Sequence, residues 1–255
     1  WFQQRCSSQR KFLQLWAHLI VMRAKYMFMK NKVIVVTGTS RGIGLELTKL
    51  FIEKGFEVVS ISRKINSNLE KLSGCFCFSA DITNKQSLDP VVAFLKAEKK
   101  EVVGLVNNAG ALVNKPFAAL TSEDFKTMFK VNVLGVAHVN QAVLPFMKAK
   151  SHVVTISSMG GVQGSMKFPG LAAYSTSKGA VITLSELLAE EYKEQQIAFN
   201  VLALGAVQTE MLEEAFPGYQ APSTAKEMAE YILNFTLTGH QFYNAKVLQV
   251  SSSTP

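Results

Sequence analysis

The strongest structural signal in this chain is VIVVTGTSRGIG, residues 33–44. Its first half is rich in Val and Ile, as expected for a buried strand. Three glycines follow, and a helix-like pattern begins at once. Glycines let the backbone turn sharply and approach a ligand, while a helix N-terminus offers free N–H groups and the positive end of its dipole. A glycine turn between a strand and a helix is typical of a site for a dinucleotide pyrophosphate.

Outward from this turn, short apolar runs alternate with segments of helical length. We expect strands at residues 33–37, 57–61, 75–79, 102–106, 152–156, 198–203 and 246–250. We expect helices near residues 42–54, 84–99, 122–148, 173–194 and 224–237. Nearly continuous apolar strands that alternate with helices are typical of a parallel sheet covered on both faces. The sequence therefore predicts an α/β, doubly wound Rossmann fold in a single domain, with about seven parallel strands and helices on both faces of the sheet.

Composition excludes several other classes of protein. The chain has 255 residues, of which 48% are hydrophobic and 18% charged, so it is not a disordered chain. No apolar run reaches the roughly 18 residues of a membrane span. The net charge of +8 is concentrated in residues 1–32, which hold seven basic residues and no acid. The rest of the chain is almost neutral, so we expect no nucleic-acid partner.

Residues 1–28 differ from the rest, being basic and without acids. We expect them to be an extraneous or loosely ordered leader, and residues 29–255 to be the folded domain. A transit peptide or surface anchor is the alternative. Cys6, Cys75 and Cys77 cannot form a paired framework, which favours a reducing compartment, the cytoplasm. We interpret Cys75 and Cys77 as two small residues on a buried strand, rather than as a thiol pair. No spacing of histidines or cysteines fits a metal site.

The end of the second strand indicates which dinucleotide is bound. An NAD site places an acid about 20 residues after the glycines, where it binds a ribose hydroxyl. Here the strand ends SISRK, residues 60–64, without an acid. Arg41 in the turn and Arg63 after the strand offer guanidinium groups, which bind phosphate through a planar fork. The predicted cofactor is therefore NADP(H). The alternative is that Arg63 and Lys64 are ordinary solvated charges.

Tyr174 and Lys178 lie one helical turn apart, so they share a face of the predicted helix. A nearby ammonium favours the phenolate and lowers the pKa of a tyrosine from about 10. Ser158 ends the preceding strand, at the edge of the sheet where ligands bind. The Tyr-x-x-x-Lys spacing alone is common by chance. The spacing becomes significant because it comes after the glycine turn and after the strand that ends in Ser158, in this order.

Residues 31–250 resemble the short-chain dehydrogenase/reductase family, of the single-domain type. The resemblance is carried by Thr37 to Gly44, Asp81, Asn107 to Gly110, Asn132, Ser157 with Ser158, Tyr174 with Lys178, and Asn200 to Thr209.

The resemblance implies four catalytic residues. Tyr174 would be the general acid in reduction and the general base in oxidation. Lys178 would bind the nicotinamide ribose and lower the pKa of Tyr174. Ser158 would hold the carbonyl oxygen, and Asn132 would kink its helix and hold a water. Adjacent strand residues point to opposite faces, so only one of Ser157 and Ser158 can serve, and the resemblance favours Ser158.

The resemblance also implies where the cofactor binds. The cofactor-binding residues would be Gly38, Ser40, Arg41, Gly42, Ile43, Gly44, Arg63, Asp81, Ile82, Asn108, Ala109, Gly110, Tyr174, Lys178, Gly205, Val207 and Thr209. Asn107 would brace neighbouring strands. On the substrate side we expect Met159, Phe168, Met211 and Phe216, which favour an apolar substrate, although such residues are as often plain core. Residues 164–167 resemble an insertion beside the substrate, and residues 208–223 have the length of a lid.

Together these observations predict an NADP(H)-dependent oxidoreductase, which interconverts a ketone or aldehyde and an alcohol by hydride transfer. The alternative is a non-catalytic NADP-binding sensor or regulatory protein, which would not need the tyrosine, lysine, serine and asparagine. A sugar-nucleotide epimerase usually needs a larger substrate domain than the segment after Thr209 provides. Helices 122–148 and 173–194 are apolar on more than one face. The family resemblance implies that two such helices pair with those of a second copy, so we expect a homodimer through them, with a tetramer as the alternative.

Overall fold

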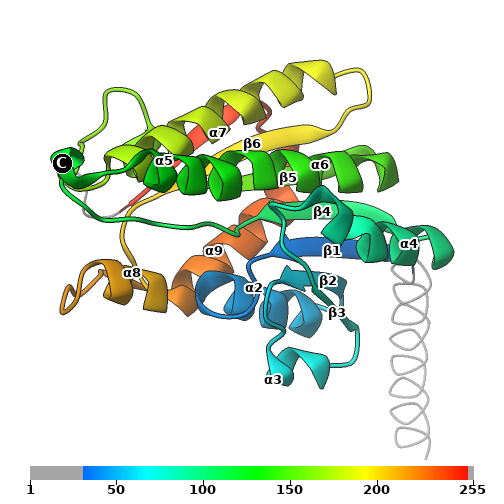
Figure 1. The fold of residues 1–255 in the computed structure, drawn as a ribbon. Coiled ribbons are helices and arrows are strands. Elements are labelled where there is room, and N and C mark those ends of the chain that lie inside the picture. The colour runs from blue at the N-terminus through cyan, green and yellow to red at the C-terminus, as the bar shows by residue number, and fades with distance from the viewer. Residues whose placement is uncertain (1–30, 252–255) are drawn as a thin grey trace, which may run out of the picture.

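A single parallel sheet forms the centre of the molecule (Figure 1). The computed structural model describes residues 31–251, so the leader predicted at residues 1–28 lies outside the described residues. The strand order is β3-β2-β1-β4-β5-β6-β9. The strands are β1 Lys32–Thr37, β2 Glu57–Ser62, β3 Cys75–Ser79, β4 Glu101–Asn107, β5 Met147–Ser158, β6 Ala198–Leu204 and β9 Lys246–Val250. All seven predicted strands are present, which confirms the doubly wound fold.

Helices cover both faces of the sheet (Figure 1). One face carries α4 Asp89–Ala97, α5 Ser122–Phe129, α6 Gly135–Val143 and α7 Ala172–Glu191. The other carries α2 Gly42–Glu53 and α9 Ala225–Thr238. The sequence did not predict the short helices α3 Ser67–Glu70 and α8 Glu210–Ala215, or the pair β7 Val207–Gln208 and β8 Ser223–Thr224. Short 3-10 turns lie at Lys85–Leu88, Phe117–Ala119, Leu144–Phe146, Met159–Gly161 and Gly239–Gln241. Among residues 31–251, no helix combines the length and apolar composition that crossing a bilayer requires.

The strands are apolar on both sides because the core has two layers. Val33 and Val35 of β1 pack in the layer under α4 and α6, whereas Ile34 and Val36 pack in the layer under α2 and α9. This alternation follows from the period of two along a strand. Cys75 and Cys77 are half-buried rather than core residues, and their Sγ atoms lie 3.6 Å apart. Their strand, β3, is at the edge of the sheet and is therefore less covered.

The helix predicted over residues 122–148 ends earlier, at Val143, and contains a π-turn. α5 passes into a π-turn at Lys130–Leu134, and α6 ends at Val143. A 3-10 turn containing Pro145 follows, and the chain is already in β5 from Met147. Proline has no N–H to continue a helical ladder, so it ends the helix here. The apolar pattern of residues 144–148 therefore belongs to a turn and a strand.

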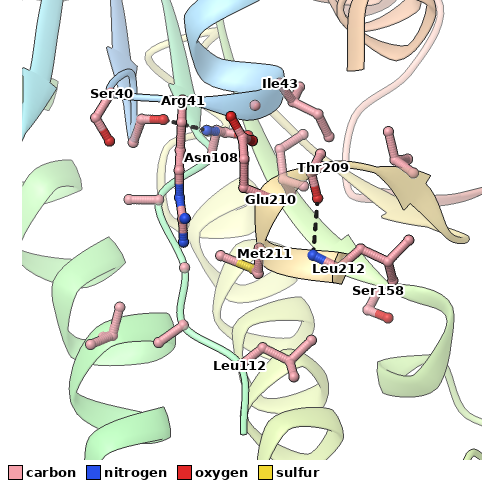
Figure 2. A pocket seen from close by; sticks show the side chains of 18 of the residues that line it. Ser40, Arg41, Ile43, Asn108, Leu112, Ser158, Thr209, Glu210, Met211 and Leu212 are labelled. Atoms are coloured by element: carbon pink, nitrogen blue, oxygen red, sulfur yellow. Dashed lines mark hydrogen bonds between the residues drawn. The ribbon is translucent and has the colours of Figure 1, made fainter. Parts of the chain in front are cut away.

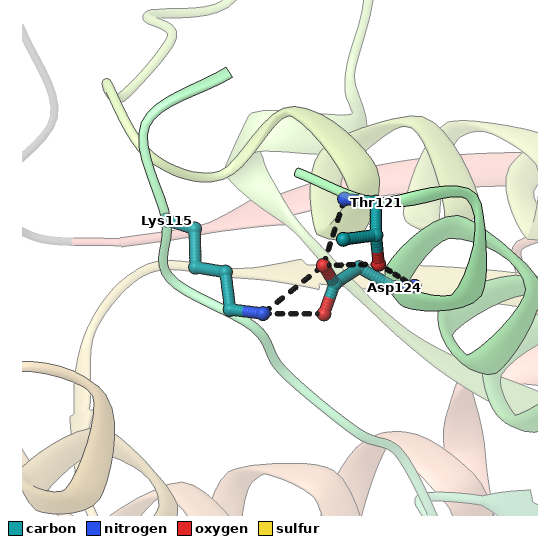
Figure 3. Close-up of polar contacts among 3 residues, drawn as sticks. All are labelled: Lys115, Thr121 and Asp124. Atoms are coloured by element: carbon teal, nitrogen blue, oxygen red, sulfur yellow. Dashed lines mark hydrogen bonds and ion pairs between the residues drawn. The ribbon is translucent and has the colours of Figure 1, made fainter. Parts of the chain in front are cut away.

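The chain that follows β4 is fixed at the N-terminus of α5. Thr121 and Asp124 form a reciprocal capping box, in which Thr121 N donates over 2.9 Å and Asp124 N over 3.2 Å (Figure 3). Lys115 Nζ lies 2.8 and 3.0 Å from the two carboxylate oxygens of Asp124. These contacts lower the pKa of Asp124 to about 2, and the hydrogen bond from Lys115 has the largest effect. The ion pair holds the segment after β4 against α5.

A buried histidine lies near the N-terminal ends of the strands. His152 is 0% exposed, its Nδ1 donates to Thr236 O over 3.0 Å, and its Nε2 accepts from Asn200 over 2.9 Å. Both ring nitrogens are thus used by the neutral imidazole. Burial lowers the pKa of His152 to about 4, with a smaller contribution from His240.

We expect the free energy of unfolding to fall as the pH is lowered from 6.5 towards 4. The unfolded chain takes up the proton of His152 near its ordinary pKa of 6.5, while the folded chain resists it until about 4. The loss is about 3 kcal/mol for this group. Urea unfolding across this range measures it, with His152→Gln as control. The variant should be less stable at neutral pH but lose less stability on acidification. If the free energy of unfolding depends on pH equally in the wild-type protein and the variant, His152 is not the group responsible.

Candidate active site

The glycine turn is packed too tightly for side chains. Gly38 has a φ of +73°, and a Cβ there would lie 2.8 Å from the Cα of Ala109. A Cβ on Gly44 would lie 2.3 Å from Gly38 O. The side chain of the N-cap residue, Arg41, makes no capping hydrogen bond at the start of α2, which leaves the first N–H groups of the helix to an anion. This close backbone approach and open helix end fit the pyrophosphate of a dinucleotide.

The end of β4 holds this turn in place. Thr37 Oγ1 accepts from Asn108 N and Ala109 N over 3.1 and 3.0 Å. The side-chain amide of Asn108 donates to Thr37 O and Gly38 O over 2.9 and 3.2 Å. β1 and β4 are the neighbours between which the strand order reverses, which is where open α/β sheets bind ligands. Asn107 braces the same region, since its Nδ2 donates to Asn140 Oδ1 over 3.2 Å.

A cavity of about 1540 Å³ opens at this edge of the sheet. Figure 2 shows Ser40 and Arg41 at the glycine turn, and Thr209, Met211 and Leu212 at the start of α8. Every predicted site residue lines the cavity except Gly44 and Asn132. Gly44 packs behind the turn, against Gly38, and Asn132 lies behind Ala111. Residues far apart in the chain, from Gly38 after β1 to Ser251 after β9, thus meet around one space.

Tyr174 and Lys178 project from the first turns of α7. Ser158 acts to lower the pKa of Tyr174, but burial dominates and raises it to about 12. Lys178 is 5% exposed, and its Nζ donates to Ile156 O over 2.8 Å and lies 5.9 Å from the centre of the Tyr174 ring. Burial lowers the pKa of Lys178 to about 8. In this structure the pKa of Tyr174 is therefore raised, opposite to the expected direction, because burial outweighs the effect of Ser158.

The two serines at the end of β5 have different partners. Ser157 is buried, and its Oγ donates to Lys178 O over 2.9 Å. Ser158 lies near enough to Tyr174 to influence the pKa of the phenol, and its Oγ accepts from Gly160 N over 3.3 Å. The structure therefore brings Ser158, and not Ser157, to the tyrosine hydroxyl.

Asn132 stands in the π-turn between α5 and α6. Its side-chain amide pairs with the backbone of Ala111, accepting over 2.8 Å and donating over 2.9 Å. It also donates to Ser177 Oγ over 2.9 Å. A Cβ on Gly110 would lie 3.3 Å from Asn132 Oδ1 and 3.5 Å from Lys178 Nζ, so all three meet in a small space. The π-turn is a local kink of the kind that the family resemblance implies at this residue.

α8 contributes contacts that the sequence did not predict. Glu214 pairs with Arg41 through both carboxylate oxygens, one at 2.9 Å from Nη2. This hydrogen bonding is the main cause that raises the pKa of Arg41. Asn114 Nδ2 donates to Ala215 O over 2.9 Å. No local pattern could have indicated these pairs, because they join segments about a hundred residues or more apart in the chain.

A sequence model described as short chain dehydrogenase matches residues 32–220. The chain belongs to this family. Among its relatives, a 3-amino-tetrahydro-pyrrolizinone reductase of Xenorhabdus hominickii is 33% identical over 184 residues, or 71% of this chain and 63% of the reductase. The match thus spans less than two thirds of that relative. A diacetyl reductase [(S)-acetoin forming] of Staphylococcus aureus is 32% identical over 207 residues, 77% of each chain.

Solved structures agree with this assignment of the short-chain dehydrogenase fold. A 4-hydroxyisoleucine dehydrogenase complexed with NADH is 25% identical, with a TM-score of 0.76 over 87% of this chain and 97% of that one. ElxO with NADP bound has the same TM-score at 23% identity, over 86% and 97% of the two chains. Within residues 31–251 of this short-chain dehydrogenase, no group of three or more His, Cys, Asp or Glu side chains forms a candidate metal site.

Gly44→Ala should both destabilise this short-chain dehydrogenase and weaken dinucleotide binding. The new methyl group meets a backbone oxygen at 2.3 Å, so α2 and the glycine turn must separate. Such overpacking costs about 1–3 kcal/mol of unfolding free energy. Chemical denaturation and dinucleotide titration measure the two effects. Glu53→Ala, at an exposed position of the same helix, is the control. Wild-type stability and binding in Gly44→Ala would contradict this account of the turn.

Proposed function

We propose that this short-chain dehydrogenase is an NADP(H)-dependent oxidoreductase, which interconverts a ketone or aldehyde and an alcohol. The observation that carries the proposal is that Ser158, Tyr174 and Lys178 line the cavity that begins at the glycine turn, with Lys178 Nζ 5.9 Å from the centre of the Tyr174 ring. Dinucleotide binding alone would not need these three side chains. The names of two relatives, a diacetyl reductase and a pyrrolizinone reductase, support a reductase.

The side chains can stabilise a carbonyl oxygen and supply its proton. Ser158 and Tyr174 line the same part of the cavity, where their hydroxyls together can hold a substrate oxygen. With its pKa near 12, Tyr174 is protonated at neutral pH, the form that a general acid requires. In reduction it gives this proton to the substrate oxygen, and in oxidation the tyrosinate takes it back. Lys178 stabilises that tyrosinate by its charge. When bound, the nicotinamide supplies or accepts the hydride.

The preference for NADP(H) rests on the charges around one end of the cavity. Arg41 and Arg63 both line it, and β2 ends at Ser62 without an acid. Two guanidinium groups and no carboxylate at the end of β2 favour a 2′-phosphate over a free ribose hydroxyl. Titration with NADPH and NADH tests this preference, and equal or tighter binding of NADH would contradict it.

The other end of the cavity supports an apolar substrate. Met159, Phe168, Met211 and Phe216 all line it. Met166, from the loop that resembles an insertion, lines it too, and Phe168 is 47% exposed. An apolar wall with a few converging polar groups fits a small hydrophobic carbonyl compound.

The assembly and location also belong to the proposal. Leu134 and Leu187 are 53% and 63% exposed on the segments expected to form a dimer. Exposed large apolar side chains favour burial against a second copy of the chain. The thiols of Cys75 and Cys77 are free, which fits the cytoplasm. Residues 29–255 would form the catalytic domain.

Tyr174→Phe should bind NADPH with wild-type affinity but lose turnover by at least about a hundredfold, because a positioned general acid contributes that much or more. NADPH oxidation with a panel of ketones, aldehydes and quinones measures turnover. Tyr231→Phe, which removes a hydroxyl on α9, is the control and should be fully active. Undiminished turnover in Tyr174→Phe would overturn the assigned role. NADPH binding by the wild-type protein without turnover on any compound would favour a sensor.

Leu187→Lys should shift the protein from dimer to monomer in light scattering, because a buried lysine without a partner destabilises an interface. Phe242→Lys, at a 78% exposed position outside the expected interface, is the matched control and should leave the dimer intact. A monomeric wild-type protein would contradict the proposed assembly.

A further inference from the structure

We infer that Glu214 competes with the 2′-phosphate of the cofactor for Arg41, and thereby lowers the selectivity of this protein for NADPH over NADH. This inference rests on the proposed NADP(H) function. It concerns a residue of α8 that no sequence motif singles out.

The geometry places Arg41 between the glycine turn and α8. Its guanidinium bonds to both carboxylate oxygens of Glu214, with Nη2 at 2.9 Å from Oε2. Figure 2 shows the Arg41 side chain extended away from the turn, with Glu210 beside it. Glu210 also attracts Arg41 electrostatically, and its Oε2 lies 3.5 Å from where a Cβ on Gly42 would be. Two carboxylates of α8 are thus directed at the turn that would receive the cofactor phosphates.

Arg41 cannot serve both anions with the same atoms. A guanidinium binds a carboxylate or a phosphate in the same bidentate way, through one planar pair of N–H groups. A 2′-phosphate that uses this pair must therefore displace Glu214. NADH carries no phosphate there, so its binding can leave the ion pair intact. The cost of breaking the pair falls on NADPH alone.

The displaced carboxylate also stays near the phosphate. α8 is fixed at its start by Thr209, whose Oγ1 accepts from Leu212 N over 3.3 Å. It is fixed at its end by Asn114, whose Nδ2 donates to Ala215 O. These contacts do not involve Arg41, so losing the ion pair leaves α8 in place. Glu214 therefore acts on the 2′-phosphate in two ways: it competes for Arg41, and its own negative charge repels the bound phosphate.

The expected effect is modest because the pair is exposed. The side chains of Arg41 and Glu214 are 45% and 62% accessible. Ion pairs this open contribute little free energy, equivalent to about 2- to 5-fold in a dissociation constant. The competition therefore adjusts selectivity and does not block NADPH binding.

The test is calorimetric titration of NADPH and NADH into the full-length protein. Glu214→Gln should raise the ratio of the NADH to the NADPH dissociation constant about 2- to 5-fold. Glu213→Gln is the matched control, because it removes the same charge from the same helix while its Oε1 can still accept from Gly218 N. Its ratio should equal that of the wild-type protein. The gain in Glu214→Gln should shrink at high salt, because exposed charges are screened.

A double-mutant cycle distinguishes competition for Arg41 from a general charge effect. In an Arg41→Ala background, Glu214→Gln should raise the ratio less than in the wild-type background, because only the direct repulsion remains to be relieved. An equal gain with and without Arg41, or an unchanged ratio in Glu214→Gln, would overturn the inference while leaving the proposed function intact. A wild-type protein that binds neither dinucleotide would overturn both.

Discussion

Three backbone segments meet at the end of β1 with no space for a side chain between them. The turn at Gly38 lies against Ala109, and the start of α2 at Gly44 lies against Gly38. The amide of Asn108 joins β4 to this turn by two hydrogen bonds. Because the backbone itself is the packing surface, the free N–H groups of α2 are held at the point where the sheet reverses its strand order. The remaining parts of the cavity are arranged around this contact.

The end of the cavity at Tyr174 depends on a second close approach, between the chain after β4 and α7. The π-turn carries Asn132 to the backbone of Ala111, while Ser177 and Gly110 fill the space towards Lys178. Asn132 and Lys178 are buried polar groups, and each is hydrogen-bonded. A buried polar network of this kind is stable only in one arrangement. It therefore fixes the position of α7, and with it the phenol of Tyr174.

Much of this could be predicted from the sequence, because local patterns carry it. The strands are apolar runs, and the glycine turn and the Tyr-x-x-x-Lys pair are short motifs in a fixed order. The kink at Asn132 was implied by the family resemblance, but its form as a π-turn could not be read from the residues, because contacts with Ala111 and Ser177 define it. The pairing of Arg41 with Glu214 joins residues 173 positions apart, and no local pattern records it. The raised pKa of Tyr174 follows from burial, which requires the packed structure.

The small parallel pair β7–β8 has a consequence for how this protein can diversify. Val207 pairs with Ser223 and Gln208 with Thr224, so the residues between them leave and rejoin the body of the protein at one place. Met211 and Phe216, which line the apolar end of the cavity, lie inside this closed segment. Its two ends are fixed by backbone pairing, whatever side chains lie between. Met211 and Phe216 can therefore be exchanged for side chains of other shapes, which remodels the apolar wall of the cavity, while the backbone pairing that anchors the segment and the sheet beyond it stay the same.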